Sequence, residues 1–184
     1  TLPSWYLGKY PDRNVIEVSY NEEYAKKFGR RNRSKIKEFG KDIFDVYVTP
    51  DVDTVTAFEL NNGKGGMISC GILTGITGNP AHLVIIDDPV KNMAEADSVN
   101  RREQVWEEYL ASIRTRIKPG GKLILILTRW HEDDLAARII NAEKNVTVIN
   151  LPLEAEENDP LGRPVGAPLC PELGRDEKWL VDYK

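Results

Sequence analysis

The chain has 184 residues, of which 41% are apolar and 29% are charged, and its formal net charge is −4. This balance is typical of one globular domain with a substantial buried core. No run of eighteen apolar residues occurs, so the sequence predicts no membrane-spanning helix. The first residues have neither the basic nor the apolar region of a secretory signal, and the two cysteines predict reduced thiols rather than a disulfide framework.

The first part of the chain predicts a strand, a helix and a hairpin. Residues 13–20 predict a strand because they are rich in β-branched side chains. Asn21 predicts the N-cap of a helix that extends to about Phe39. Residues 55–72 predict a hairpin, since apolar and polar residues alternate on either side of the Asn62-Gly63 turn.

The rest of the chain alternates apolar runs with helical patterns. Leu83–Ile86 and Leu123–Leu127 are continuous apolar runs, which suit parallel strands buried on both faces. A helix from about Ser98 to Ile117 separates them, and Val146–Leu151 predicts a further strand. From Pro152 onward, prolines and glycines predict an extended linker. We therefore expect an α/β fold with a mostly parallel sheet and helices on both faces.

Positive charge is concentrated between Lys26 and Lys41, where eight basic residues accompany one acid, while the remainder carries a net charge of −11. The predicted helix there could use Arg30, Arg31 and Arg33 to contact the phosphates of a polyanion such as double-stranded DNA. The alternative is an ordinary solvated helix face. The sequence leaves both interpretations open.

Polar side chains follow two of the predicted central strands. Asp87 and Asp88 come directly after the first, and Thr128 and Arg129 come directly after the second. Because ligands bind beyond the carboxyl ends of parallel strands, we expect Asp87 and Thr128 at one edge of the sheet. Asp87 could hold Mg²⁺ and Asp88 could orient a water for attack on a γ-phosphate. Thr128 and Arg129 could sense that phosphate.

A simpler interpretation exists for each of these clusters. Acids often follow strands only because the loops there are wet. Asp133 and Asp134 fit the first turn of a helix, which would leave Arg129 in a surface ion pair. His82 and His131 have no metal-ligand spacing around them, so we expect neither to bind zinc.

Several segments together resemble a known family. They are "TGNPAHLVIIDDPVKNMAEADS", "IRTRIKPGGKLILILTRWHEDDLAARI", "LPSWYLGKYPDRNVIEVSY" and "DPLGRPVGAPLCPE". The chain resembles the large terminase subunit of tailed bacteriophages and prophages over nearly its whole length. "IIDDPVKN" matches that family's Walker B region, and "TRWHEDDL" matches its coupling motif.

The resemblance implies a P-loop NTPase core of the ASCE, RecA-like type, truncated before the Walker A loop. It would occupy residues 1–151, and residues 152–184 would be a linker toward a nuclease domain that this sequence lacks. By motif position, Asp87 corresponds to the acid that coordinates Mg²⁺. Asp88 stands where many relatives carry a glutamate as catalytic base, and Thr128 and Arg129 correspond to the coupling motif.

The function implied is that of an ATP-driven motor that moves viral double-stranded DNA into a procapsid. Mg²⁺ and ATP would be its cofactors, and the portal protein and the small terminase subunit would be its partners. The motor would assemble as a ring in the cytoplasm of the bacterial host.

The sequence departs from the family pattern in two further ways. No G-x-x-x-x-G-K-[ST] loop is present, so the phosphate cradle is missing. Some relatives place an arginine before Walker B, where this chain has Gly78-Asn79-Pro80. We expect residues 1–184 alone to show negligible ATPase activity. The alternatives are a helicase-like P-loop ATPase of another family and a non-catalytic DNA-binding or assembly remnant of a prophage.

Overall fold

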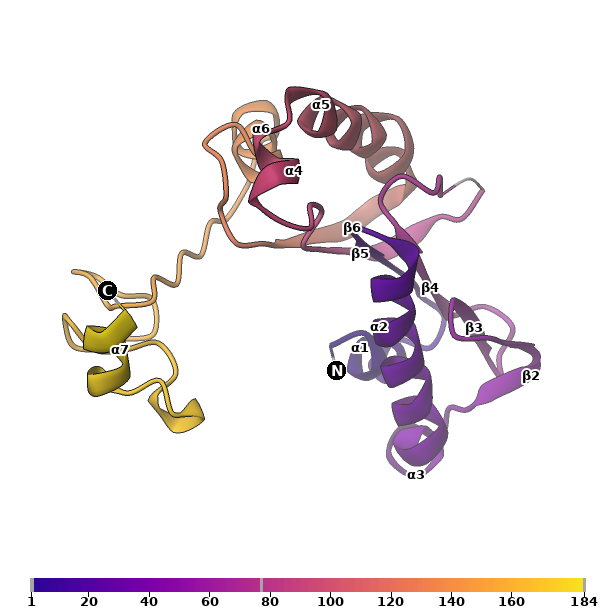
Figure 1. Ribbon diagram of the computed structural model, residues 1–184. Coiled ribbons are helices and arrows are strands. Elements are labelled where there is room, and N and C mark those ends of the chain that lie inside the picture. Colours follow the sequence, from indigo (N-terminus) through magenta and orange to yellow (C-terminus); the bar gives the residue numbers. More distant parts are fainter. Residues whose placement is uncertain (1, 77, 184) are drawn as a thin grey trace. The chain divides into compact units, whose positions relative to one another are not determined.

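The computed structural model describes residues 2–76 and 78–183. The chain divides into two compact units, with the division between Ala142 and Glu143. The first unit holds a six-stranded sheet with its helices, and the second contains little regular structure (Figure 1). Within the described ranges, no helix is long and apolar enough to cross a membrane.

The sheet is mixed, and four of its strands form a parallel block. In spatial order the strands are β2 (Val48–Asp53), β3 (Ala57–Leu60), β4 (Gly66–Gly71), β1 (Asn14–Ser19), β5 (Ala81–Asp87) and β6 (Ile117–Ile126). Neighbours from β4 to β6 run parallel, whereas β2 pairs with β3 and β3 with β4 in antiparallel fashion. The prediction that Val15–Val18, Leu83–Ile86 and Leu123–Leu127 pair in parallel within one sheet is therefore confirmed. The expectation of a mostly parallel sheet holds only for this block, because the antiparallel strands β2 and β3 make the whole sheet mixed.

The order of the strands explains the patterns in the sequence. β1 and β5 are central and covered on both faces, so their side chains are buried without alternation. The hairpin prediction is also confirmed: β3 and β4 are antiparallel, and Gly63 in their turn has a φ of 65°. The edge strand β2 was not predicted, because its sequence VTPDVD contains a proline and two acids and buries little.

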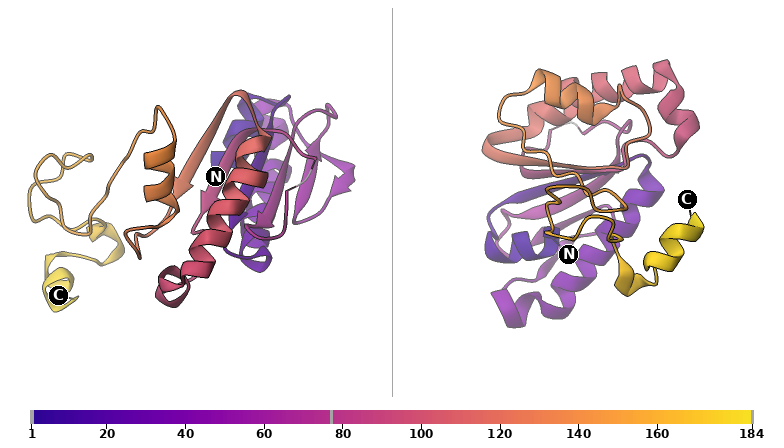
Figure 2. Two further views of the ribbon diagram at one scale, coloured as in Figure 1. Left: turned by 90° about the horizontal axis from the view of Figure 1, so that it is seen from above. Right: turned by 90° about the vertical axis from the view of Figure 1, so that its left-hand side faces the viewer.

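Helices cover both faces of the sheet, as expected (Figure 2). On one face lie α5 (Val99–Glu108), its continuation through a π-turn (Tyr109–Ile113) and a 3₁₀ turn (Arg114–Arg116), and α6 (Leu135–Ala142). On the other face lie α1 (Leu2–Lys9) and α2 (Glu22–Lys35), which continues through a π-turn (Ile36–Gly40) into α3 (Lys41–Phe44). The short α4 (Met93–Asp97) precedes α5.

Each helical layer closes a separate part of the core. Tyr109 and Ile113 pack with Ile86 of β5 on one face, and Leu7 packs with Val15 of β1 on the other. Each of these side chains is at most 2% exposed. Complete burial of such a side chain contributes about 1.5–3 kcal/mol, so the two apolar layers supply most of the stabilisation of the sheet.

Helix α2 approaches the sheet closely. Its N-cap is Asn21, as predicted, and the Asn21 side chain accepts a 2.8 Å hydrogen bond from the Tyr24 backbone N–H. A Cβ atom added to Gly29 would lie 2.0 Å from the Val55 carbonyl oxygen and 2.9 Å from the Ser69 hydroxyl. Glycine is therefore required here by the space between helix and sheet rather than by backbone conformation.

The predicted strand Val146–Ile149 is wrong. These residues form no regular structure, and Val146, Val148 and Ile149 are 39%, 62% and 71% exposed. Apolar and β-branched residues favour an extended backbone, but a strand forms only where a neighbour supplies the ladder hydrogen bonds. No described residue pairs with this segment, whereas β6 pairs with β5 on one side and has a free edge on the other.

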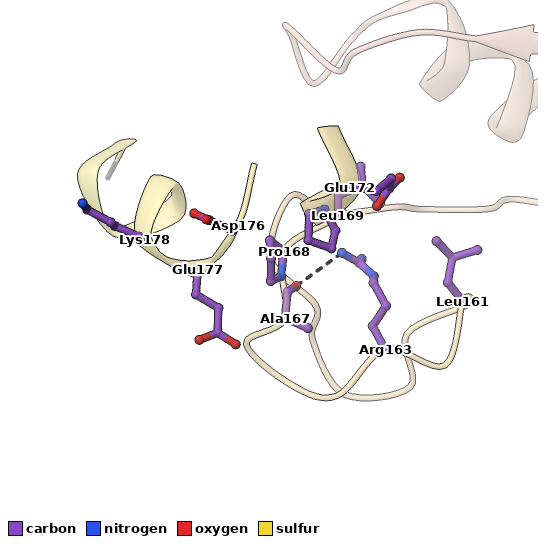
Figure 3. A pocket seen from close by; sticks show the side chains of 10 residues that line it. Leu161, Arg163, Ala167, Pro168, Leu169, Glu172, Asp176, Glu177 and Lys178 are labelled. Carbon is purple, nitrogen blue, oxygen red and sulfur yellow. Dashed lines mark hydrogen bonds between the residues drawn. The ribbon is translucent and has the colours of Figure 1, made fainter. Parts of the chain in front are cut away.

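The second unit is organised by polar contacts around Arg163. Its guanidinium pairs with Asp159 at 2.6 Å and donates to the carbonyl oxygens of Pro152 at 2.9 Å and Ala167 at 3.4 Å. A 3₁₀ turn (Pro171–Leu173) and α7 (Glu177–Tyr183) follow. A cavity of about 730 Å³ is lined by residues of this unit alone, and Figure 3 shows the side chains around it. Every residue predicted to form the site belongs to the first unit, so this cavity is not part of it.

Candidate functional site

The two predicted polar clusters meet at one edge of the sheet. Asp87 is the last residue of β5 and pairs in register with Ile126, the last residue of β6. The Asp88 backbone N–H donates a 2.9 Å hydrogen bond to the Ile126 carbonyl oxygen. Thr128 follows two residues later, so the prediction that Asp87 and Thr128 share the carboxyl edge of the sheet is confirmed.

The backbone separates the two neighbouring acids. Asp88 has a φ of 47°, in the left-handed region that non-glycine residues rarely adopt. Such a conformation costs on the order of 1 kcal/mol and persists only where the surroundings impose it. Because the strand ends at Asp87, Asp88 no longer follows the strand alternation. The two carboxylates can therefore serve different atoms of one ligand.

Buried negative charge accumulates behind this edge. Burial, and after it the nearby charge of Asp88, raises the pKa of Asp87. Glu17, in the centre of β1, is 3% exposed. Burial raises the pKa of Glu17 to about 7, and the charge of Asp87 adds to that effect. Both shifts reflect carboxylates that have lost water and, among the described residues, have gained no cation.

Glu17 was not predicted as a site residue from the sequence, and neither were two serines on the same face of the sheet. Alternation along β1 and β4 and their register place Glu17, Ser19 and Ser69 on the face of the sheet that also carries Asp87. Glu17 Oε2, Ser19 Oγ and Ser69 Oγ are buried and have no hydrogen-bond partner among the described residues. A signal was available, since Glu17 interrupts the apolar run Val15–Val18. A charged residue inside such a run is rarely buried without a reason.

The donor set limits which metal ion could bind. Among residues 2–76 and 78–183, no three His, Cys, Asp or Glu side chains are grouped so that they could hold a metal ion. A cation at this edge would therefore be held by Asp87 and by water. Mg²⁺ fits this arrangement because it binds one or two carboxylates and keeps several waters, whereas Ca²⁺ and Zn²⁺ need more protein ligands. The unpartnered oxygens of Glu17 and Ser19 fit it too, since bound waters need acceptors.

The segment after β6 is held by a network of ion pairs. Arg129 pairs with Asp134, and the other oxygen of Asp134 accepts a 2.9 Å hydrogen bond from the Ala137 backbone N–H at the start of α6. Asp133 pairs with Arg138 at 2.6 Å and with Arg102 of α5 at 3.3 Å. The two guanidinium groups, Arg138 first, lower the pKa of Asp133 to about 2. The interpretation of these acids as helix-terminal residues is therefore confirmed for Asp134, which caps α6 and pairs with Arg129, but not for Asp133, which precedes the helix and pairs with Arg138 and Arg102.

Thr128 and Trp130 lie next to a very small cavity of about 20 Å³, which Arg102 and Asp134 also line. This volume suffices for about one water molecule. Thr128 itself is exposed at the sheet edge. The hydroxyl of Thr128 is therefore accessible to a ligand beyond the edge, whereas Arg129 would first have to leave Asp134.

The basic residues of α2 differ in their availability. Arg30 and Arg31 are exposed. Arg33 instead donates to the carbonyl and carboxylate oxygens of Asp53 in β2, at 3.0 and 3.1 Å, and Lys37 pairs with the same carboxylate. Of the three arginines predicted to contact DNA, only Arg30 and Arg31 are thus presented to solvent without a competing partner in the described structure.

The histidines and cysteines have structural surroundings. His82 Nδ1 accepts a 3.1 Å hydrogen bond from the Asn14 backbone N–H, and His131 Nδ1 accepts one of 2.9 Å from the Asp133 backbone N–H. Cys70 and Cys170 are free thiols, and burial raises the pKa of Cys70 to about 12. A thiol with such a pKa is not a nucleophile at neutral pH.

Comparison with models of protein families identifies the family of the chain. The family model described as "Terminase large subunit, T4likevirus-type, N-terminal" matches residues 1–179. The match covers both units and includes every residue of the candidate site. A search of curated proteins finds no relative of this chain.

Proposed function

Because the chain belongs to the family of N-terminal regions of T4-like large terminase subunits, which package phage DNA, we propose that it is part of an ATP-driven motor for double-stranded DNA. The observation that carries this proposal is the position of Asp87, at the carboxyl end of the central strand β5 and beside the end of β6. Ligands of open parallel sheets bind at that edge.

Each residue at the edge has a distinct role in this proposal. Asp87 would hold Mg²⁺, which would supply positive charge to stabilise the phosphates of ATP. Asp88, turned away by its left-handed backbone, accepts a hydrogen bond from the attacking water and aligns it with the leaving group. Thr128 and Arg129 contact the γ-phosphate and respond to its loss.

ATP binding at this edge requires a phosphate-binding loop in addition to the described sheet. Without a G-x-x-x-x-G-K-[ST] loop, this chain offers no backbone amides or lysine to hold a triphosphate. In the part of the chain that the structure describes, no strand pairs with the outer edge of β6, and Ile126 of β6 is 53% exposed. A further strand that carries a phosphate-binding loop would pair there, cover Ile126 and complete a P-loop NTPase core of the RecA-like type.

The decisive experiment compares the 184-residue chain with the same chain joined to a segment that carries such a loop. We expect negligible hydrolysis from the first and Mg²⁺-dependent ATP hydrolysis from the second. In the joined protein, Asp88→Asn should abolish turnover while sparing nucleotide binding, because it removes a base but little ground-state contact. Asp87→Asn should also weaken Mg²⁺-dependent binding. An Asp88→Asn variant with normal turnover would show that the site is misassigned.

The partners follow from the same proposal. Double-stranded DNA would contact Arg30 and Arg31 through its phosphates, and the portal protein, the small terminase subunit and further copies of the chain would assemble around it. A non-catalytic DNA-binding or assembly role remains the competing hypothesis, because exposed arginines alone would support it. Absence of hydrolysis from the joined protein, with DNA binding intact, would favour that role.

A further inference from the structure

Glu17 and Ser19 have buried oxygens to which none of the described residues donates a hydrogen bond. Ser19 is 0% exposed and Glu17 is 3% exposed, and Ser19 Oγ and Glu17 Oε2 have no partner among the described residues. A buried polar group without a hydrogen bond costs about 1–3 kcal/mol, and a charged one costs more. A folded protein retains two such groups side by side only if something else satisfies them.

The register of the sheet shows where that partner would lie. Ser19 pairs directly with Asp87 across β1 and β5, and Glu17 lies one row deeper on the same face. Asp87 is therefore the polar residue of β5 that lies directly opposite Ser19. Whatever Asp87 holds at the edge of the sheet lies within reach of Ser19 and, through a water, of Glu17.

A hydrated divalent cation supplies the missing donors. Mg²⁺ and Mn²⁺ held by one carboxylate keep several water molecules, and each of these donates hydrogen bonds. Carboxylates and hydroxyls that accept from metal-bound groups orient the coordination sphere, and their loss typically costs 10–100-fold in metal affinity. No arginine or lysine among the described residues pairs with Glu17 in place of such waters.

We propose that Glu17 and Ser19 are positioning residues for a hydrated divalent cation bound by Asp87, and that they accept hydrogen bonds from the waters of that cation. The inference rests on the proposed role of Asp87. It assigns to β1 a part of the metal site that lies outside both motifs of the family resemblance. Glu17 and Ser19 do not touch the metal, so their effect is on its affinity and on the order of its waters.

Ser69 provides a matched control for Ser19. Its hydroxyl is also buried and unpartnered on the same face, at 2% exposure, but it lies on β4, with β1 between it and Asp87. Ser19→Ala and Ser69→Ala both remove one buried hydroxyl from this face, but Ser69 pairs in register with Glu17, whereas Ser19 pairs with Asp87. Only Ser19→Ala removes it from the row that contains Asp87.

The test is a titration of the 184-residue chain with Mn²⁺, in which electron paramagnetic resonance measures the free ion. Glu17→Met removes both acceptor oxygens and is expected to weaken binding about 10–100-fold. Glu17→Gln keeps one acceptor without the charge and is expected to lie between Glu17→Met and the wild type. Ser19→Ala should weaken binding, and Ser69→Ala should not. Unfolding by urea, measured without metal, shows that each variant is folded.

The outcomes separate this inference from the proposed function. If Asp87→Asn abolishes Mn²⁺ binding while Glu17→Met and Ser19→Ala leave it unchanged, the positioning role is overturned and the role of Asp87 stands. If Asp87→Asn leaves binding unchanged, the proposed function fails at its metal ligand. Equal effects of Ser19→Ala and Ser69→Ala, or no binding to the wild type at millimolar Mn²⁺, would also overturn the inference.

Discussion

The buried carboxyl group of Glu17 predicts an unusual dependence of stability on pH. Its pKa is raised from an ordinary value of 4.5 to about 7 in the folded protein. The folded state therefore binds the Glu17 proton more tightly than the unfolded state does. An acid whose pKa is higher in the folded state than in the unfolded state stabilises the fold fully at pH values below its unfolded-state pKa. That contribution is lost as the pH rises toward the folded-state pKa. The stability that Glu17 contributes should thus fall as the pH rises from about 4.5 to about 7, and it should remain low at higher pH.

The size of the effect follows from the pKa displacement. One pKa unit corresponds to about 1.4 kcal/mol, so the full displacement corresponds to about 3 kcal/mol. Because Glu17 is 3% exposed, water screens little of this energy. Glu17→Gln cannot ionise and should escape the loss. Its stability advantage over the wild type should grow from about 1 kcal/mol near pH 5 to about 3 kcal/mol near pH 8.

Urea unfolding in the presence of a chelator, measured across this pH range for both proteins, tests the prediction. His82 must be considered, because burial and then nearby positive charge lower its pKa and so make stability rise with pH. The difference between variant and wild type cancels this contribution, which both proteins share. Glu59→Gln, at an exposed position of β3, controls for the substitution itself. Parallel pH profiles for Glu17→Gln and the wild type would refute the reasoning.

Three further predictions address DNA contact, packing and helix capping. Charge reversal at both Arg30 and Arg31 should weaken DNA binding at low salt and reduce the slope of log affinity against log salt by about 2. Charge reversal at Arg33, which pairs with Asp53, should change DNA affinity less. Unchanged affinity after the double reversal would contradict the DNA interface. Gly29→Ala should destabilise by about 1–3 kcal/mol in urea unfolding, because its Cβ would lie 2.0 Å from a loop carbonyl oxygen. Asp134→Ala should cost about 1–2 kcal/mol through loss of the α6 cap, and a smaller effect would show that the cap is redundant.

Much of the fold was predictable because its central strands are covered on both faces. Leu83–Ile86 has an apolar run that only a doubly covered strand favours, and Asn21 caps its helix by local hydrogen bonding. Leu123–Leu127 was predicted in the same way, but β6 is an edge strand in the described structure and is only partly buried. The two failures concern strands whose formation depends on neighbours rather than on their own sequence. β2 forms despite its polar sequence because β3 pairs with it. Val146–Ile149 does not form a strand because no described strand pairs with these residues.

The candidate site was predictable only in part, for a related reason. Asp87 and Thr128 follow apolar strands, so their common edge could be inferred from the direction of the strands. The proximity of Glu17 and Ser19 to Asp87 depends on β1 lying beside β5, and no local pattern specifies that neighbour. The engagement of Arg33 with Asp53 depends likewise on a strand that the sequence did not predict.

The ion pair of Arg129 decides whether its proposed role in coupling is energetically feasible. To reach a γ-phosphate, Arg129 must leave Asp134, and half of its side chain is exposed. Asp134 is buried, so breaking the pair costs more than the roughly 0.2–1 kcal/mol of a fully exposed pair, and a charge-assisted bidentate contact to phosphate would have to offset that cost. The departure would not release α6, because Asp134 keeps its hydrogen bond to the Ala137 N–H and Asp133 stays between Arg102 and Arg138. Arg129 can therefore exchange partners while the helix behind it remains in place, as a residue that senses phosphate must.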